Sequence, residues 1–500
     1  MGQALLPLII PLLSFILQSY PRLFNKLFGV DVWTRLLETD HIRKNNHRIP
    51  TKILGGQFLI EGYFDYPPIF PTILSFIPRT KLLHIQGIIA PFIDSLQVIF
   101  VFYLAYYLTG NQLLALTAQV MYMLTPMIAI ENSYLTPRSL GYFNFSLAVV
   151  PLLLFVFQGN ILFYILGVLF TSLLFLTHRF AIQSFLFIAI FFTFLLNTGV
   201  FMQSFLLGFA IAMLATKGYY IRVLKGHMFN IYFWIKNLDY RFAHQIRGVI
   251  KKNTKTDFVN KIYTFLSVFS PVAIFGLNPW ALSGFGVLLS FQAGWLPQNP
   301  LYQAMSAWII FFYALGVVVL KTKKLMPIGE GQRYMEMATV PSSILSSYLL
   351  FELLKSPFSL LIKVLFVLLL LLNLSVILFI QIKGVIKDKN RSITSDLEKV
   401  FSFINKQNTK PRIVCIPHQN TTMTIYHTKA QVFVNADNPG LMRVQEVYPI
   451  LTVPINELAR KYGLTHALVK ESFATLKELG LSQKKIVYES GDVKLVSLSK

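Results

Sequence analysis

Long apolar stretches alternate with short polar segments along most of this 500-residue chain. Each is about as long as the roughly 17 to 25 residues with which a helix crosses a bilayer. They lie at 4–20, 86–108, 111–130, 142–157, 161–177, 180–196, 199–215, 263–296, 303–320, 335–354 and 358–382. The stretch at 263–296 holds Pro271, Pro279 and Gly284, so it is one bent crossing or two short ones. The pattern predicts an all-α polytopic membrane bundle of about 11 transmembrane helices, with 11–13 possible.

The pattern changes near residue 384, where charged residues become frequent and apolar runs shorten to strand length. The tail is predicted to contain strands at 412–416, 430–434 and 464–470, a helix or turn near 420–426, helices at 455–462 and 472–480, and a hairpin at 485–498 that turns at Ser490-Gly491. We therefore expect a transmembrane domain at 1–383 and a small soluble α/β domain at 384–500. The first domain carries polar loops at 21–85, 131–141, 216–262 and 321–334.

Composition agrees with a membrane protein, since 54% of the residues are hydrophobic and only 13% are charged. Soluble domains carry about twice that share of charge. The net charge of +23 is not interpreted as a nucleic-acid signal. Basic loops beside membrane helices explain it, as does attraction to anionic lipids or phosphates. The single cysteine, Cys415, excludes an intramolecular disulfide and a multi-cysteine metal site.

A polar loop opens at Asp31, directly after the first apolar stretch, and closes at Tyr66-Pro67-Pro68. It places the Asp31 carboxylate at the membrane–water interface. There the carboxylate can act as a general base, or it can cap the helix that follows. Asp40 lies further along the same loop and either contacts a substrate or faces solvent.

Charged residues also mark two later positions. Glu131 and Arg138 lie seven residues apart where a helix is predicted to end. They either bind a substrate or pair with each other, and an arginine there suits a phosphate. His178 and Arg179 interrupt an apolar stretch, where ionisable groups are functional candidates. A plain turn between two short helices would also explain them.

A fourth candidate cluster lies in the loop at 321–334, which reads Gly329-Glu330-Gly331-Gln332-Arg333-Tyr334. Glycines allow a ligand to approach the backbone closely, and Arg333 suits a phosphate or pyrophosphate group. The alternative is an ordinary basic loop that continues from the lysines just before it.

Several of these residues resemble the first external loop of GT-C glycosyltransferases. The matching positions are Asp31-x-Trp33-x-x-x-Leu37, Ile42, Pro50 and Tyr66-Pro67-Pro68. Members of this group are polytopic enzymes that transfer sugars from polyprenyl-phosphate or polyprenyl-pyrophosphate donors. They include oligosaccharyltransferase catalytic subunits, protein O-mannosyltransferases and aminoarabinose transferases of lipid A.

The resemblance implies roles for the candidate residues. Asp31 and Glu131 would be catalytic, and both would hold a divalent metal ion if one takes part. Arg333, with Arg138, Arg179 and His178, would bind the donor phosphate. The substrate would also contact Tyr66, Glu330, Tyr334 and Asp40.

The implied function is direct transfer of a sugar or oligosaccharide from a polyprenyl-phosphate-type donor to a glycan, lipid or protein acceptor. The protein would be integral to the plasma membrane, with no nucleic-acid partner and no certain cofactor. Its active site and tail would face outward. The lysines and arginines gather on that same face, and the positive-inside rule would place them in the cytoplasm.

Two other classes remain open from the sequence. Residues 455–465, followed by Val469 and 476–480, resemble a winged helix-turn-helix, which would make the protein a membrane-tethered regulator. A strand at 464–470 favours the GT-C tail and a helix there favours the winged module. A transporter or flippase of a lipid-linked glycan is the other class, although the chain has no internal repeat. Asp94 and Glu352 lie within apolar stretches and would be its candidate residues, while helix packing through hydrogen bonds would also explain them.

Overall fold

Helices dominate the computed structural model, which describes residues 2–50, 57–60, 64–249, 275–434 and 445–498. By its internal contacts the chain divides into two units. The helical unit comprises Met1–Lys26, His84–Tyr220 and Lys255–Lys387. The sheet unit comprises Leu27–Leu83, Ile221–Thr254 and Asp388–Lys500. Two parts of the predicted features, 250–262 of the basic loop and 263–274 of the long apolar stretch, lie outside the described residues.

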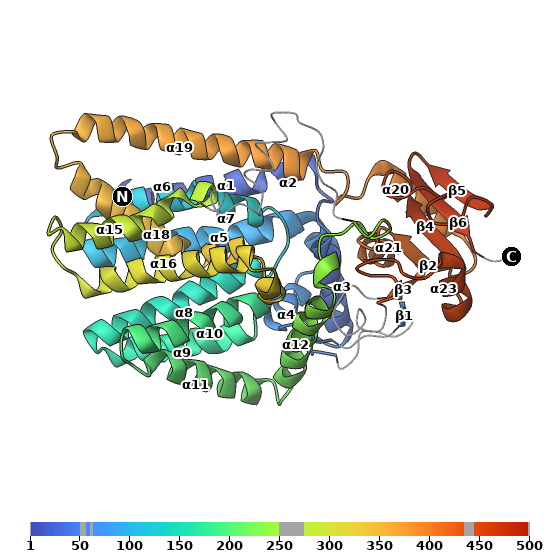
Figure 1. Cartoon of the computed structure of the whole chain (residues 1–500), viewed down its shortest axis with the longest axis horizontal. Coiled ribbons are helices and arrows are strands. Elements are labelled where there is room, and N and C mark those ends of the chain that lie inside the picture. The colour runs from blue at the N-terminus through green and yellow to red at the C-terminus, as the bar shows by residue number, and fades with distance from the viewer. Residues whose placement is uncertain (1, 51–56, 61–63, 250–274, 435–444, 499–500) are drawn as a thin grey trace. The chain divides into compact units, whose positions relative to one another are not determined.

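The helices of the helical unit follow the predicted apolar stretches (Figure 1). They are α1 (Gly2–Ser19), α2 (Pro21–Phe24), α5 (Arg79–Thr109), α6 (Gln112–Met123), α7 (Pro126–Glu131), α8 (Arg138–Gln158), α9 (Ile161–Phe175), α10 (Arg179–Leu195), α11 (Val200–Ala215), α15 (Leu282–Gln292), α16 (Pro300–Lys321), α17 (Gly331–Glu336), α18 (Thr339–Leu353) and α19 (Ser359–Gln381).

Five of the described helices are long and apolar enough to cross a membrane, or up to six if α11 and α12 (Tyr220–Lys236) together form one bent span. The five spans are Leu6–Phe24, Arg79–Thr109, Arg138–Gln158, Pro300–Lys321 and Ser359–Ile386. The predicted number of about 11 crossings is therefore not confirmed. Several predicted stretches form helices that are short or broken: α9 has 15 residues, and Pro126 separates α7 from α6.

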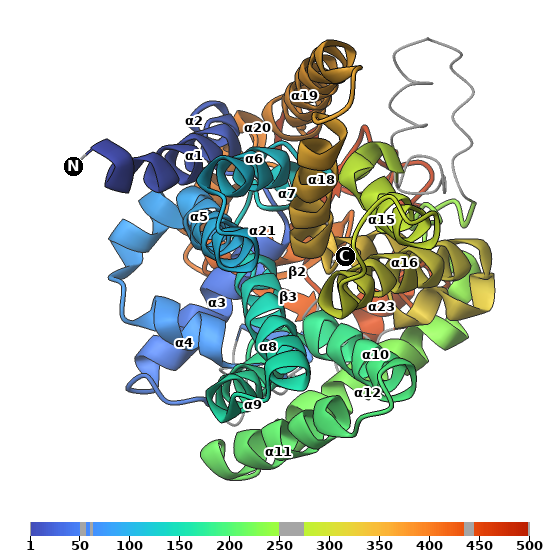
Figure 2. The same cartoon turned by 90° about the vertical axis from the view of Figure 1, so that its left-hand side faces the viewer.

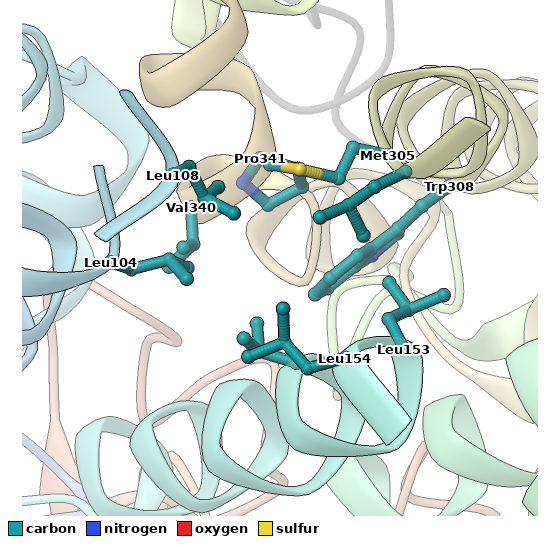
Figure 3. A pocket seen from close by; sticks show the side chains of 10 residues that line it. Leu104, Leu108, Leu153, Leu154, Met305, Trp308, Val340 and Pro341 are labelled. Atoms are coloured by element: carbon teal, nitrogen blue, oxygen red, sulfur yellow. The ribbon is translucent and has the colours of Figure 1, made fainter. Parts of the chain in front are cut away.

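Apolar side chains of the helical unit are partly buried between helices and partly exposed on its surface. Figure 2 shows α19 at the rim of the unit, and only 11% of its most apolar window is buried. Such an exposed apolar surface suits contact with lipid. Deeper in the unit, a small pocket lies between α5, α8, α16 and α18 (Figure 3). Its lining is wholly apolar, with Leu104, Leu154, Trp308 and Val340 among the residues.

Two acids of the helical unit, buried Asp94 and half-buried Glu352, are held by neighbouring side chains. Asp94 on α5 accepts hydrogen bonds from the Gln18 amide (2.6 Å) and the Tyr122 hydroxyl (2.8 Å). Glu352 pairs with Lys355 at 2.7 Å, at the end of α18. Both residues are thus held by protein groups, as expected of ionisable side chains among membrane helices.

The sheet unit combines one mixed sheet with several helices. Its elements are α3 (Asp31–Lys44), β1 (Phe58–Ile60), α4 (Ile69–Ser75), most of α12, α20 (Ser395–Lys406), β2 (Arg412–Ile416), α21 (Asn420–His427), β3 (Gln431–Val434), α23 (Ile455–Tyr462), β4 (His466–Lys470), β5 (Ile486–Ser490) and β6 (Val493–Ser497). The strand order is β1-β3-β2-β4-β6-β5. Three pairs are parallel, namely β1 with β3, β3 with β2, and β2 with β4. The last strand in the chain, β6, runs antiparallel to both β4 and β5.

Both faces of the sheet are covered because side chains alternate along each strand. Val414 and Ile416 of β2 share a core with Leu458 of α23. The intervening Cys415 contacts Thr424 of α21, at 3.4 Å between Sγ and the hydroxyl oxygen. The tail strands are therefore buried on two sides, which explains their nearly continuous apolar sequence.

Most elements predicted for the tail are confirmed. β4 is a strand paired with β2 and β6, and this result favours the GT-C tail over the winged module. The helix predicted at 472–480 is wrong, because the segment forms successive turns. Thr475 and Glu478 bond each other's backbone amides through their side chains, as at the start of a helix, but Gly480 with a φ of 66° ends the segment before a full helix forms.

The predicted first loop contributes to the sheet. Within that loop β1 pairs in parallel with β3, with Phe58 opposite Val432 and Ile60 opposite Val434. The backbone at Gly29 also donates to Arg391 at 2.7 Å. Residues 27–83 therefore fold together with the tail, which brings Asp31 into the sheet unit.

Candidate active site

Asp31 is the exposed first residue of an otherwise buried helix. The next eleven residues of α3 are buried. Trp33 packs against Tyr426 and His427 of α21, with ring centroids 5.5 and 4.5 Å apart. The Asp31 carboxylate forms no hydrogen bond or ion pair with the described residues of its unit, and its charge acts on the nearby Tyr448. The pattern of Asp31, Trp33 and Leu37 thus anchors a helix whose first carboxylate stays accessible.

Asp40 and Tyr66 are held by arginines of the same unit. Asp40 is 8% exposed and forms ion pairs with Arg43 and, at 3.1 Å, with Arg79. The Arg35 guanidinium lies 3.7 Å from the centre of the Tyr66 ring. Both side chains therefore stabilise the fold around α3, and their contact with a substrate stays a prediction.

Glu131 and Arg138 form an ion pair in the helical unit. Glu131 ends α7 and Arg138 begins α8, so the six residues between them form a tight connection. Arg138 is 5% exposed, while 27% of the Glu131 side chain is accessible. The pairing holds a buried guanidinium at the end of a membrane helix.

Arg333 and Glu330 form a second ion pair, at 2.9 Å. Glu330 also accepts a hydrogen bond from the Gln332 amide at 3.0 Å. About 30% of the Arg333 side chain remains exposed. Arg333 is therefore positioned by its own short helix, α17, and by its ion pair with Glu330.

Tyr334 fixes the loop that precedes α17. Its buried hydroxyl donates to the Ile328 carbonyl at 2.9 Å and accepts from the Gln183 amide at 2.7 Å. The backbone at Gly329 has φ of 146°, and a Cβ there would lie 2.6 Å from the Phe180 ring. Only glycine fits this position. Tyr334 thus has a structural role here, and its contact with a substrate stays a prediction.

A buried carboxylate that the sequence analysis missed joins the two ion pairs. Glu336, the last residue of α17, is 2% exposed and interacts electrostatically with Arg138, Tyr142 and Arg333. Burial raises the pKa of Glu336 to about 7, despite these cations. The available signal in the sequence was an acid alone among apolar residues, three positions after Arg333.

His178 and Arg179 begin α10. The His178 ring accepts a hydrogen bond from the Ala181 amide at 3.3 Å and so caps the helix. It also lies edge-on to the Tyr142 ring, with centroids 6.1 Å apart. Arg179 is 8% exposed and acts electrostatically on Tyr220. His178 therefore contacts Tyr142, which in turn interacts with Glu336.

The described residues offer few side chains that could bind a metal ion together. Glu131 is engaged by Arg138, and Asp31 belongs to the other unit. Within the described part of the chain, no three His, Cys, Asp or Glu side chains form a group that could hold a metal ion. The predicted metal pair of Asp31 and Glu131 stays a prediction, and we derive no catalytic step from it.

Comparison of the whole chain with solved structures identifies its fold. ArnT from Cupriavidus metallidurans, bound to undecaprenyl phosphate, matches with a TM-score of 0.57 and 13% identity over 100% of this chain and 98% of that one. The archaeal oligosaccharyltransferase AglB from Archaeoglobus fulgidus, in complex with an inhibitory peptide and a dolichol-phosphate, matches with a TM-score of 0.61 and 9% identity. That match covers 93% of this chain and 69% of AglB.

The chain has a GT-C fold. The resemblance seen in the sequence is thereby confirmed at the level of structure, and the chain is an integral membrane protein. No protein-family model and no curated protein sequence matches the chain. The fold is therefore shown by the arrangement of helices and sheet, while the activity rests on the site residues.

Proposed function

We propose that this protein is a membrane glycosyltransferase that uses a polyprenyl-phosphate-type lipid donor. The observation that carries the proposal is the pair of guanidinium groups, Arg138 and Arg333, held around buried Glu336 within a GT-C fold. A guanidinium binds phosphate oxygens through paired, charge-assisted hydrogen bonds. The GT-C proteins with which the chain shares its fold were solved with such lipids, undecaprenyl phosphate in ArnT and a dolichol-phosphate in AglB.

The proposed reaction is a direct displacement at the anomeric carbon. The acceptor oxygen or nitrogen attacks that carbon, and its proton passes to the Asp31 carboxylate acting as general base. The bond from the anomeric carbon to the phosphate oxygen breaks, and the lipid phosphate leaves with the bonding electrons. A single displacement inverts the configuration at the anomeric carbon.

Stabilising the departing phosphate is the larger electrostatic task. Arg333 would carry most of it because its side chain is partly exposed, and Arg138 would assist from its buried position. His178 and Arg179, at the start of α10, would complete the positive surroundings. Glu131 would act by orienting Arg138, to which it is paired.

The acceptor would be a glycan, lipid or protein on the extracytoplasmic side of the plasma membrane. Nucleotide sugars do not occur there, so a lipid-linked donor is the consistent choice. The exposure of Asp31 supports this role, since a base must be open to an incoming acceptor.

The test is a transfer assay with full-length protein in proteoliposomes. Radiolabelled polyprenyl-phosphate sugars would serve as donors, and membranes from cells that lack the protein would supply acceptors. We expect Asp31→Asn to lower the transfer rate about 10²- to 10⁴-fold, because the general base is lost. Arg333→Gln should also lower the rate strongly.

Glu489→Gln is the matched control, since Glu489 is an exposed acid on β5 with a long 3.9 Å contact to Lys494. It should transfer sugar at the wild-type rate. Full activity of Asp31→Asn would contradict the proposed base, and the absence of transfer by the wild type from any lipid-linked donor would contradict the proposed donor class.

A further inference from the structure

Buried oxygen atoms without partners lie on the segments that carry Arg138 and Arg333. The amide oxygen of Gln332 and the hydroxyl group of Ser139 are buried and have no hydrogen-bond partner among the described residues, while buried Glu336 and Tyr142 interact with each other. Buried polar groups are hydrogen-bonded in nearly all cases, so an unpaired group of them needs an explanation. A polar ligand that binds there would supply one.

Helix geometry places these groups in two facing sets. Gln332 and Glu336 are four residues apart on α17, and Ser139 and Tyr142 are three apart on α8, so each pair shares a helix face. The electrostatic interaction of Glu336 with Tyr142 joins the two faces. On this geometry the four side chains line one site.

The chemistry of these side chains indicates the ligand. The oxygens of Glu336 and Gln332 are acceptors, so their partner must donate O–H or N–H groups. An ionised phosphate offers only acceptors and would be repelled by Glu336. A sugar ring donates several hydroxyls, and the hydroxyls of Ser139 and Tyr142 can either donate to it or accept from it.

The same site is flanked by cations. Arg138 precedes Ser139, and Arg333 lies between Gln332 and Glu336 in the sequence of α17. A phosphate bound by these arginines would therefore lie directly beside the oxygens of these side chains. The arrangement matches a sugar joined to a phosphate, with each half facing groups of complementary chemistry.

We propose that Glu336, Gln332, Tyr142 and Ser139 form a subsite that binds the hydroxyl groups of the donor sugar. The proposal rests on the proposed function for the phosphate half of the ligand. It assigns to Glu336 the recognition of the sugar, a role distinct from the phosphate binding of Arg333.

The experiment compares two kinds of lipid on full-length protein in nanodiscs. One is polyprenyl phosphate without a sugar, and the other is a set of three polyprenyl phosphates that carry mannose, glucose or arabinose. Binding would be measured for the wild type, Glu336→Gln and Arg333→Gln. Glu352→Gln, the same change at the exposed end of α18, is the matched control.

We expect the wild type to bind at least one sugar-bearing lipid more tightly than polyprenyl phosphate. Glu336→Gln should weaken that binding by about ten- to a hundredfold, since hydrogen bonds to a charged acceptor are lost. It should leave polyprenyl phosphate binding unchanged. Arg333→Gln should weaken the binding of both kinds of lipid, and Glu352→Gln should weaken the binding of neither.

Two results would overturn the subsite. The first is that Glu336→Gln binds every sugar-bearing lipid as tightly as the wild type does. The second is that Glu336→Gln loses the same amount of affinity for lipids with a sugar as for polyprenyl phosphate without one. Tyr142→Phe removes a single hydroxyl beside Glu336, and its selective loss of sugar-lipid affinity provides the same test if Glu336→Gln does not fold. A wild type that binds none of the four lipids would instead contradict the proposed function.

Discussion

At the scale of single residues, the functional argument depends on charge in two different settings. Asp31 is exposed and has its carboxylate open, as a general base requires. Glu336 is buried among Arg138, Tyr142 and Arg333, and its carboxylate interacts with all three. Asp31 was predictable because it opens a polar loop, whereas Glu336 was missed because nothing in its local sequence shows which side chains surround it.

Binding of the sugar-bearing lipid should depend on pH through Glu336. The groups that face it are Arg138 and Tyr142 from α8, Arg333 and Glu330 from the α17 segment, and Tyr122 from α6. Its pKa is raised to about 7, so the carboxyl is protonated below that pH and becomes a pure acceptor above it. Affinity should therefore rise between about pH 6 and pH 8.

The measurement is the dissociation constant of the sugar-bearing lipid across that pH range. In Glu336→Gln the rise should disappear, because an amide does not titrate. A rise that persists in the variant would assign the pH dependence to another group.

At the scale of elements, the site depends on how closely α17 approaches α16. A Cβ at Gly331 would lie 2.3 Å from the Gly316 carbonyl oxygen and 2.5 Å from Leu320. The glycines of the loop at 321–334 were interpreted in the sequence as a place for ligand approach. In the structure Gly331 instead allows two helices to pack, and this packing positions Arg333 and Glu336.

We expect Gly331→Ala to lower the thermal unfolding temperature and to weaken polyprenyl phosphate binding. The added methyl group meets backbone, which can yield only if α17 shifts, and such overpacking costs about 1–3 kcal/mol. Thermal unfolding in detergent and the nanodisc binding assay would measure the two effects. Gly286→Ala, where a Cβ meets the flexible Leu349 side chain at 3.0 Å, should have the smaller effect. Equal effects of the two changes would contradict this account.

At the scale of the whole molecule, the side of the membrane that the sheet unit faces decides which substrates are available. Cys415 is a poor reporter of that side, because it is 2% exposed and burial raises the pKa of its thiol to about 12. An exposed site on the same unit is needed. Glu457 on α23 provides one, since its neighbours Ile455 and Leu458 anchor the helix in the core.

In a Cys415→Ala background, Glu457→Cys should react with a membrane-impermeant maleimide added to intact cells. Lys355→Cys, in the exposed turn between α18 and α19, is predicted to lie on the opposite face and should react only after the membrane is opened. The reverse pattern would follow the positive-inside rule and would contradict the extracytoplasmic site. Labelling of permeabilised cells controls for accessibility.

The residue pattern along the chain was enough to predict most of the local structure. Apolar length predicted the positions of the helices, and short apolar runs predicted β2, β3 and β4, because these patterns reflect contacts that each segment makes along its own length. The exception is 472–480, where Gly480 with a φ of 66° ends the segment soon after the Thr475–Glu478 pair and no full helix forms.

Which distant segments and side chains contact each other became clear from the three-dimensional structure. It showed that β1, about 370 residues before β3, completes the sheet, that Tyr334 anchors a loop, and that Glu336 lies beside Arg138 and Arg333. These contacts join segments distant in the sequence, and no periodicity encodes them. The number of membrane crossings also depends on such packing, because a short apolar helix can lie buried among neighbours or span lipid.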